Sequence, residues 1–152
     1  MKEIEIFTDG ASWGNPGKAG IGVIICDNHK KIIKKFGKFI GEATNNVAEY
    51  IALLSGLEEA LNLGAEKIKI NLDSQLLARQ IQGDYRVKEP HLRTLFERVA
   101  QLFPRFKKVE IINIPRAENK ETDKLANQAI KEAIKNNLPP EKIYLRKGRE
   151  LF

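Results

Sequence analysis

The sequence predicts an α/β protein with a mixed five-stranded sheet, in which two parallel strands extend three antiparallel ones and helices flank the sheet. Two observations support this prediction. The first part of the chain, to about residue 40, contains three consecutive segments with strand-like periodicity. The rest of the chain alternates between helical and strand-like segments, and this order adds parallel strands through crossover helices.

The N-terminal segments are expected to form a strand and then a hairpin. Isoleucine alternates with glutamate within residues 2–9, as in a half-buried strand. A loop rich in Gly, Asn and Pro is expected at residues 10–17. Residues 19–27 and 31–40 flank a short polar turn, which predicts an antiparallel hairpin.

The longest predicted helix covers residues 44–63. Val47, Ile51 and Leu54 begin a row of apolar residues that recur every three or four positions, and Gly64 stands where a helix C-terminal cap is expected. The remaining elements are expected in the order strand 67–72, helix 74–81, loop 83–90, helix 91–103, strand 109–114 and helix 121–135. The resulting order is three strands, a helix, a strand, two helices, a strand and a helix.

The length of 152 residues fits one domain, which we place at residues 1–138. Pro139 and Pro140 interrupt the chain before a C-terminal tail, residues 139–152, in which basic and apolar side chains are interleaved. We expect this tail to pack on the domain. The alternative is an additional basic contact with nucleic acid.

The net charge of +6 and the pI of about 9.4 favour polyanionic partners, although they do not by themselves predict nucleic-acid binding. A single cysteine, Cys26, excludes a disulfide within the chain and a thiolate metal cluster. The sequence has neither a long apolar span nor a signal peptide, so we expect a cytoplasmic protein that does not enter a membrane. We also expect a monomer.

Four acidic residues stand at the edges of predicted elements: Asp9, Glu49, Asp73 and Asp123. Each also has a local explanation, because Asp9 fits a turn, Glu49 a capping box with Asn46, Asp73 a helix N-cap and Asp123 the first turn of a helix. In open α/β sheets, however, sites gather beyond the carboxyl ends of strands. Four carboxylates at one such edge of a basic protein would indicate a site for divalent cations.

Four segments resemble, in the same order, the signature motifs of type 1 ribonuclease H. They are residues 8–17 (TDGASWGNPG), 44–49 (TNNVAE), 72–75 (LDSQ) and 116–126 (RAENKETDKLA). The resemblance covers about residues 1–136. It implies a ribonuclease H-like fold and an endonuclease that hydrolyses the RNA strand of RNA/DNA hybrids, leaving 5′-phosphate and 3′-hydroxyl ends.

The resemblance implies that the four acids bind two metal ions, with Asp9 bridging both, Glu49 and Asp73 completing one coordination sphere and Asp123 the other. Physical chemistry agrees with this assignment. Two carboxylates about 4 Å apart repel each other by about 4 kcal/mol at an effective dielectric constant near 20, so a cluster of four requires cations. Oxygen ligands without Cys or His favour Mg²⁺, for which Mn²⁺ can substitute, over zinc.

A nuclease that cleaves RNA but not DNA must sense the ribose 2′-hydroxyl. By resemblance, the residues that line the minor groove of the hybrid are Gly10, Ala11, Ser12, Asn15, Asn45, Asn46 and Gln75, and Thr44 holds a phosphate of the DNA strand. Asn45 and Asn46 also fit helix capping, and Asn15 fits a tight turn. These local roles are compatible with substrate binding.

The sequence departs from the family pattern at two places. Many members carry a histidine in the loop before the last acid, whereas this loop contains Arg116, which cannot transfer protons because a guanidinium stays protonated. Our hypothesis is that Arg116 holds a phosphate near the metal ions. Some relatives also have a basic helix and loop that binds substrate, whereas this chain has only the short segment 83–90 there.

Two other functions are compatible with parts of the sequence. One is a different metal-dependent nuclease on the same scaffold, such as an exonuclease, a resolvase or an enzyme that also cuts RNA/RNA duplexes. The order of the acids and the Asn-rich loops argue against the first two, while cleavage of RNA duplexes stays open. The other is a non-catalytic module that binds hybrids, which the presence of all four acids disfavours.

Overall fold

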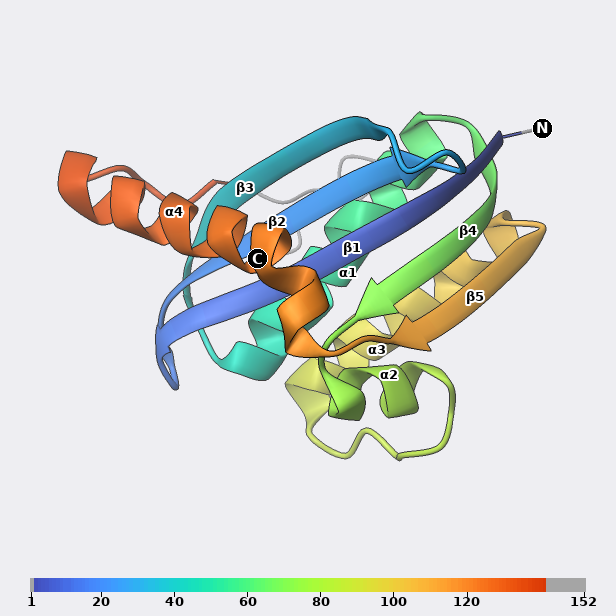
Figure 1. Ribbon diagram of the computed structural model, residues 1–152. Helices are drawn as coiled ribbons and strands as arrows, with labels where there is room; N and C mark the ends of the chain where they lie inside the picture. Colours follow the sequence, from blue (N-terminus) through green and yellow to red (C-terminus); the bar gives the residue numbers. More distant parts are fainter. Residues whose placement is uncertain (1, 142–152) are drawn as a thin grey trace.

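The computed structural model describes residues 2–141 and contains the predicted mixed sheet of five strands, in the order β3-β2-β1-β4-β5 (Figure 1). The strands are β1 (Lys2–Gly14), β2 (Gly17–Asp27), β3 (Ile32–Ala43), β4 (Ala65–Leu72) and β5 (Lys108–Asn113). The pairs β1–β2 and β2–β3 are antiparallel, and the pairs β1–β4 and β4–β5 are parallel. The predicted fold class is therefore confirmed.

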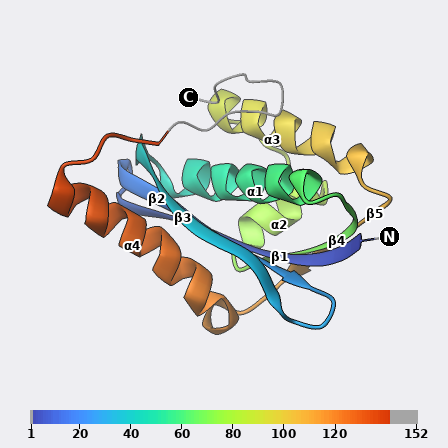
Figure 2. The ribbon, with the colours of Figure 1, turned by 90° about the horizontal axis from the view of Figure 1, so that it is seen from above.

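The helices lie on both faces of the sheet. They are α1 (Asn45–Asn62), α2 (Gln75–Ile81), α3 (Pro90–Leu102) and α4 (Lys120–Asn136), with 3₁₀ turns η1 (Phe103–Arg105) and η2 (Arg116–Asn119). Figure 2 shows α1 against one face with α3 packed on its outer side, and α4 against the opposite face. The main hydrophobic core lies between α1 and the sheet, where Ile6, Val23 and Leu53 are fully buried.

The first strand is longer than the sequence predicts. The prediction of a loop at residues 10–17 is wrong for most of these residues, because they belong to β1 and β2. The antiparallel ladder between β1 and β2 continues to the pair Gly14 and Gly17, so only Asn15 and Pro16, which are joined by a cis peptide bond, form the turn. Asp9 therefore lies inside a strand, not at its end. Gly, Asn and Pro residues in this segment are typical of a loop. Here they form a tight turn at the tip of a long hairpin.

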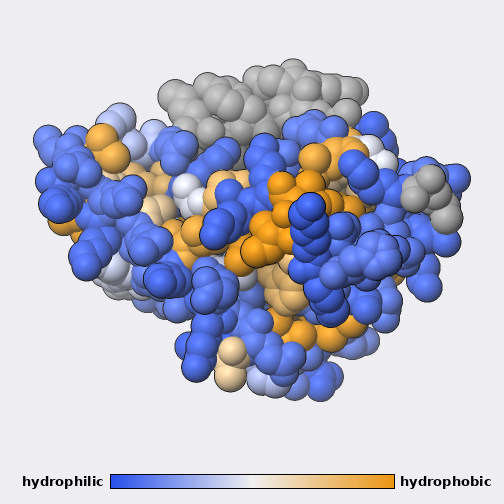
Figure 3. Space-filling model, turned by 45° about the horizontal axis from the view of Figure 1, so that its top comes forward, coloured by the Kyte–Doolittle hydropathy of each residue, from blue (hydrophilic) through white to orange (hydrophobic). Residues whose placement is uncertain are grey.

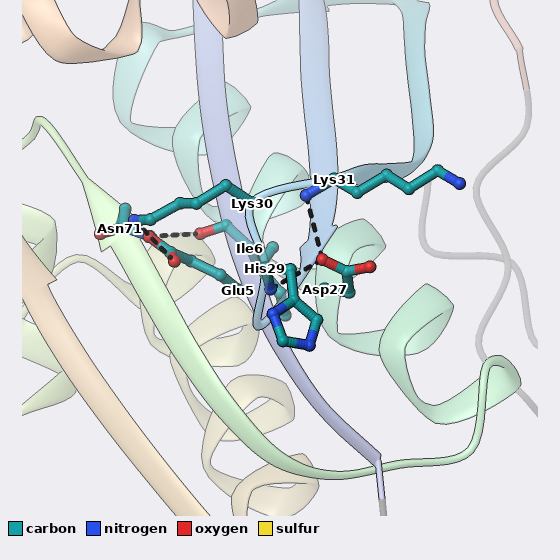
Figure 4. Close-up of polar contacts among 7 residues, drawn as sticks. All are labelled: Glu5, Ile6, Asp27, His29, Lys30, Lys31 and Asn71. Carbon is teal, nitrogen blue, oxygen red and sulfur yellow. Dashed lines mark hydrogen bonds and ion pairs between the residues drawn. The ribbon is translucent and has the colours of Figure 1, made fainter.

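The predicted hairpin between β2 and β3 is held by the side chain of Asp27 (Figure 4). Its Oδ1 accepts hydrogen bonds from the backbone N–H groups of His29 at 2.8 Å and Lys31 at 3.0 Å. These two bonds favour the ionised carboxylate and lower the pKa of Asp27. His29 thus belongs to a surface turn, as expected from the sequence.

The outer surface is mostly polar. Figure 3 shows hydrophilic residues over most of one side of the molecule, with a hydrophobic area in its middle. Among residues 2–141 no helix is both long enough and apolar enough to cross a lipid bilayer. At the end of this range, the N–H group of Glu141 donates to the carbonyl of Phe39 at 2.8 Å, while the predicted tail beyond it lies outside the described residues.

Helix α4 contacts the sheet through its own backbone, because glycines line the strands beneath it. A Cβ atom added to Gly20 or Gly37 would lie 2.5 Å from a backbone carbonyl oxygen of α4, and one added to Gly22 would overlap the carbonyl oxygen of Thr122. A glycine inside a strand often marks such a close approach of another backbone. These contacts fix the start of α4, and thus Asp123, against β2.

We expect Gly22→Ala to lower the free energy of unfolding by about 2 kcal/mol, because the added methyl group would overlap a helix backbone that cannot rotate away. Urea denaturation would measure the loss. Gly56→Ala is the matched comparison, since the atoms nearest its Cβ would be side-chain methyl groups and not the backbone of another element: those of Ile6 and Thr8 at 3.0 Å and of Val23 at 3.7 Å. Equal stabilities of the wild type and Gly22→Ala would contradict the proposed backbone contact.

Candidate active site

An open cleft of about 440 Å³ lies where β1 extends past the end of β4. The last residue of β1 that pairs with β4 is Phe7, opposite Asn71, so within residues 2–141 β1 has no strand neighbour on that side from Asp9 onward. The start of α4 and the N-terminal half of α1 close the cleft on the other sides. The residues that line it are Asp9, Gly10, Ala11, Ser12, Trp13, Asn45, Asn46, Glu49, Asp73, Ser74, Gln75, Arg116, Asp123 and Asn127.

The structure brings all four predicted acids to this cleft. Carboxylate oxygens of Asp9, Glu49 and Asp73 lie within 4.8 Å of one another, a spacing that fits a shared cation. Asp123 stands outside this group of three but lies within hydrogen-bonding reach of Asp9. Asp9 is the buried centre, with 5% of its surface exposed, whereas Asp123 is exposed on α4.

Two neighbouring groups hold the half-buried acids Glu49 and Asp73 in place. The backbone N–H of Gly10 donates to the Glu49 carboxylate, and a Cβ at position 10 would overlap the backbone of α1, so only glycine allows this approach. The side-chain amide of Asn119, which is buried, donates to Asp73 Oδ2 at 2.9 Å and to the carbonyl of Thr8 at 3.0 Å. The local sequence around Asn119 does not indicate this role, because its partners are distant in the chain.

Mutual repulsion and burial perturb the acids strongly. Burial, followed by the charge of Glu49, raises the pKa of Asp9 to about 10. Burial also raises the pKa of Glu49 to about 8, although the hydrogen bond from Asp9 and the charge of Arg116 act in the opposite direction. Without a cation, the cluster therefore retains protons at neutral pH, and a bound divalent cation would replace them.

The predicted substrate-binding residues form a connected group beside the acids. The backbone N–H of Ser12 donates to Asn45 Oδ1 at 3.1 Å, and the backbone N–H of Asn45 donates to Asn15 Oδ1 at 3.1 Å. Asn46 and Gln75 are exposed and line the cleft. Asn15 itself does not line the cleft but holds the start of α1 from the adjoining turn.

The helix-capping roles that the sequence suggests for Glu49 and Asp73 are both wrong. The N-cap of α1 is Thr44, whose hydroxyl accepts from the N–H of Val47 at 3.2 Å, so Asn46 and Glu49 form no capping box. The N-cap of α2 is Ser74, whose Oγ accepts from Leu77 at 3.1 Å. The carboxylates of Glu49 and Asp73 are therefore not used for capping.

The raised pKa of Asp9 predicts how stability depends on pH when no divalent cation is present. The folded protein keeps a proton on Asp9 that the unfolded chain releases above about pH 4, so the free energy of unfolding should fall as pH rises from about 4 to about 10. Asp9→Asn, which cannot ionise, should flatten this dependence and raise the melting temperature at pH 8 by roughly 3 °C or more. Thermal unfolding with a chelator present measures both effects.

The control for this experiment is Asp84→Asn, which removes an exposed carboxylate outside the cleft and should leave the pH dependence unchanged. Parallel stability profiles for Asp9→Asn and the wild type would show that Asp9 is not protonated in the folded state.

Comparison with known proteins shows which family this chain belongs to. Residues 7–129 match the family model described as reverse transcriptase-like. A bifunctional protein of Mycobacterium tuberculosis is 38% identical over 135 residues, which is 88% of this chain and 37% of the relative. Ribonuclease HI of Halobacterium salinarum is 39% identical over 130 residues, 86% of this chain and 65% of the relative. The chain thus spans little more than a third of the mycobacterial relative.

Solved structures of similar sequence have the same fold. RNase H1 of Halobacterium salinarum superposes with a TM-score of 0.85 at 39% identity, covering 86% of this chain and 99% of that one. LC11-RNase H1, solved in complex with an RNA/DNA hybrid, superposes with a TM-score of 0.82 at 40% identity, covering 86% and 99%. The chain therefore belongs to the reverse transcriptase-like family and forms a ribonuclease H-like domain.

Proposed function

We propose that this protein is a ribonuclease H, an endonuclease that hydrolyses the RNA strand of RNA/DNA hybrids and leaves 5′-phosphate and 3′-hydroxyl ends. The observation that carries the proposal is the convergence of Asp9, Glu49, Asp73 and Asp123 on one open cleft beside a row of amide side chains. The likeness to LC11-RNase H1, which was solved with a hybrid, supports the choice of substrate.

The donor set fits divalent cations. All candidate ligands are carboxylate oxygens, and burial together with mutual repulsion raises the pKa values of Asp9 and Glu49, which a bound cation would counteract. Asp9, Glu49 and Asp73 would hold one Mg²⁺, and Asp9 and Asp123 a second, with Mn²⁺ as a substitute. When bound, such a pair of ions supplies Lewis acidity for the attacking water and for the leaving 3′ oxygen.

The amides beside the acids are suited to reading the sugar of the scissile strand. Asn15 and Asn45 use their carboxamide oxygens to accept backbone N–H groups, so their own N–H groups are the ends available to a ligand. Asn45, Asn46, Gln75 and the backbone of residues 10–12 line the cleft and would face the minor groove of the hybrid, where the 2′-hydroxyl is displayed. Asn15 would reach the same groove from the adjoining turn.

Thr44 is placed to bind the other strand. Its hydroxyl oxygen accepts the capping hydrogen bond from Val47, and its O–H stays available as a donor to a phosphate of the DNA strand. Because the connection between α2 and α3, residues 82–89, contains no additional helix, hybrid binding would depend on few phosphate contacts and weaken with salt. The cytoplasmic location and the monomeric state stay predictions.

Arg116 is proposed to hold a phosphate of the scissile strand. It is exposed at the start of η2, lines the cleft and lies close enough to Glu49 for its charge to lower the pKa of that carboxyl. Its guanidinium is suited to phosphate because it offers several N–H donors in one plane.

A cleavage assay with end-labelled RNA/DNA hybrid, RNA duplex and DNA duplex, with and without Mg²⁺, tests the proposed function. We expect cleavage of the hybrid only with Mg²⁺. Asp9→Asn should lower the rate by at least about 10³-fold, because the central ligand loses its charge, while hybrid affinity changes little. Asp84→Asn serves as the control and should cleave at the wild-type rate.

Each alternative gives a different result in this assay. Cleavage of the RNA duplex as well would indicate the broader nuclease, and tight hybrid binding without cleavage would indicate a non-catalytic module. Substantial turnover by Asp9→Asn would contradict the bridging role of Asp9.

Replacing Arg116 with alanine should lower kcat/KM for hybrid cleavage about tenfold, since one charge-assisted contact with a phosphate contributes about 1.5–3 kcal/mol. Arg105→Ala removes an arginine of η1 that is also exposed but does not line the cleft, and should have no effect. Steady-state kinetics with both variants provides the measurement. Equal kcat/KM values for Arg116→Ala and Arg105→Ala would discard the phosphate role.

A further inference from the structure

Asn127 bridges an acid of the cleft and the only tryptophan of the chain. It lies one helical turn after Asp123 on α4, so the two side chains share a face of the helix. Its Nδ2 donates to Asp123 Oδ1 at 3.2 Å and to the Asp123 backbone carbonyl at 2.9 Å. Its Oδ1 accepts from the indole Nε1 of Trp13, near the end of β1, at 2.8 Å.

We infer that Asn127 and Trp13 are positioning residues for Asp123, through which they fix the second cation site of the proposed nuclease. This inference rests on the proposed function for its catalytic consequence. The contacts themselves are independent of it, because they join three residues that lie along one wall of the cleft.

The chemistry of the three groups selects one arrangement. An indole nitrogen can only donate, so Trp13 requires the carbonyl end of the Asn127 amide. The amide nitrogen is then directed at Asp123, where a carboxylate can only accept. If Trp13 did not fix this orientation, the amide could rotate by 180° and present its oxygen to the carboxylate, which would repel it.

Asp123 needs such support more than the other acids do. Asp9 is buried, and Glu49 and Asp73 are held by Gly10 and Asn119, respectively, whereas Asp123 is exposed in the first turn of α4. An exposed aspartate samples several rotamers, and a contact to Oδ1 leaves the other oxygen for a cation. Small displacements of a catalytic group lower rates strongly, by up to about 10²-fold for 1 Å.

The indole also connects this acid to the segment that is proposed to read the substrate. Trp13 follows Ala11 and Ser12 on β1, and Ser12 is held by Asn45 at the start of α1. A hydrogen bond between β1 and α4 thus sets the distance between the minor-groove contacts and Asp123. Its two ends are 114 residues apart in sequence.

The test uses Asn127→Ala and Trp13→Phe, which removes the indole N–H but keeps an aromatic ring. Because Trp13 is the only tryptophan, the indole N–H gives a single NMR signal. In the metal-free protein, Asn127→Ala should shift this signal and remove its protection from solvent exchange. Each protein is then titrated with Mn²⁺, and the binding is followed by the paramagnetic broadening of backbone amide signals near Asp123. In both variants the affinity for Mn²⁺ at this site should be about fivefold or more lower than in the wild type.

With hybrid substrate, Asn127→Ala should lower kcat about tenfold and raise the half-saturating Mg²⁺ concentration, with KM for the hybrid unchanged. Trp13→Phe should act in the same direction but less. Gln128→Ala, on the exposed side of α4, is the control for helix stability and should behave as the wild type.

The outcomes separate this inference from the proposed function. Unchanged Mn²⁺ affinity at Asp123 in both variants would overturn the positioning role, even if the wild type cleaves hybrids. A wild type that cleaves none of the three duplexes would refute the nuclease, and the metal titration would still decide whether Asn127 and Trp13 position Asp123.

Discussion

The repulsion between carboxylates that the fold forces together is the constraint on which the site depends. Oxygens of Asp9, Glu49 and Asp73 within 4.8 Å of one another repel by roughly 3 kcal/mol or more per ionised pair at an effective dielectric constant near 20. The folded chain tolerates this arrangement only with protons or cations on the cluster. The raised pKa values of Asp9 and Glu49 express the first option, and the proposed chemistry requires the second.

The fold brings the acids together through two features of the backbone. Strand β1 extends beyond β4, and in the described part of the chain this leaves an unpaired strand edge at Asp9 where side chains from α1 and from the end of β4 can meet. Glycines at positions 20, 22 and 37 let α4 lie directly on the strands, which brings Asp123 to the same place from the opposite face. Small residues therefore determine the position of the charged ones.

Much of the fold and the identity of the acids could be predicted from the sequence, because both depend on local signals. Periodicity indicated the strands and helices, and each acid stands in a short recognisable motif. The extent of β1 could not be predicted in this way, since Gly and Pro near Asn15 suggest a loop unless the pairing with β2 is known. The glycines at positions 20 and 22, inside a predicted strand, are a signal in the sequence that another backbone approaches closely there.

The supporting residues of the site were missed for a different reason. Asn119 and Asn127 are ordinary helix-terminal and helix-surface residues by any local criterion. Their roles come from contacts with Asp73 and Trp13, which lie 46 and 114 positions away, respectively. Long-range pairs of this kind leave no trace in periodicity or composition, so a single sequence predicts which groups can react but not which groups hold them.

The site must also move protons without a histidine. Both histidines of the chain lie away from the cleft, His29 in the turn between β2 and β3 and His91 at the start of α3. A guanidinium such as that of Arg116 cannot serve as a general acid or base, and carboxylates that hold cations are not free to accept protons. In the proposed reaction, the proton released by the attacking water and the proton taken up by the leaving 3′ oxygen must therefore be exchanged with solvent. The cleft is open to solvent and Arg116 is exposed at its edge, so the geometry permits this exchange and leaves Arg116 to bind phosphate.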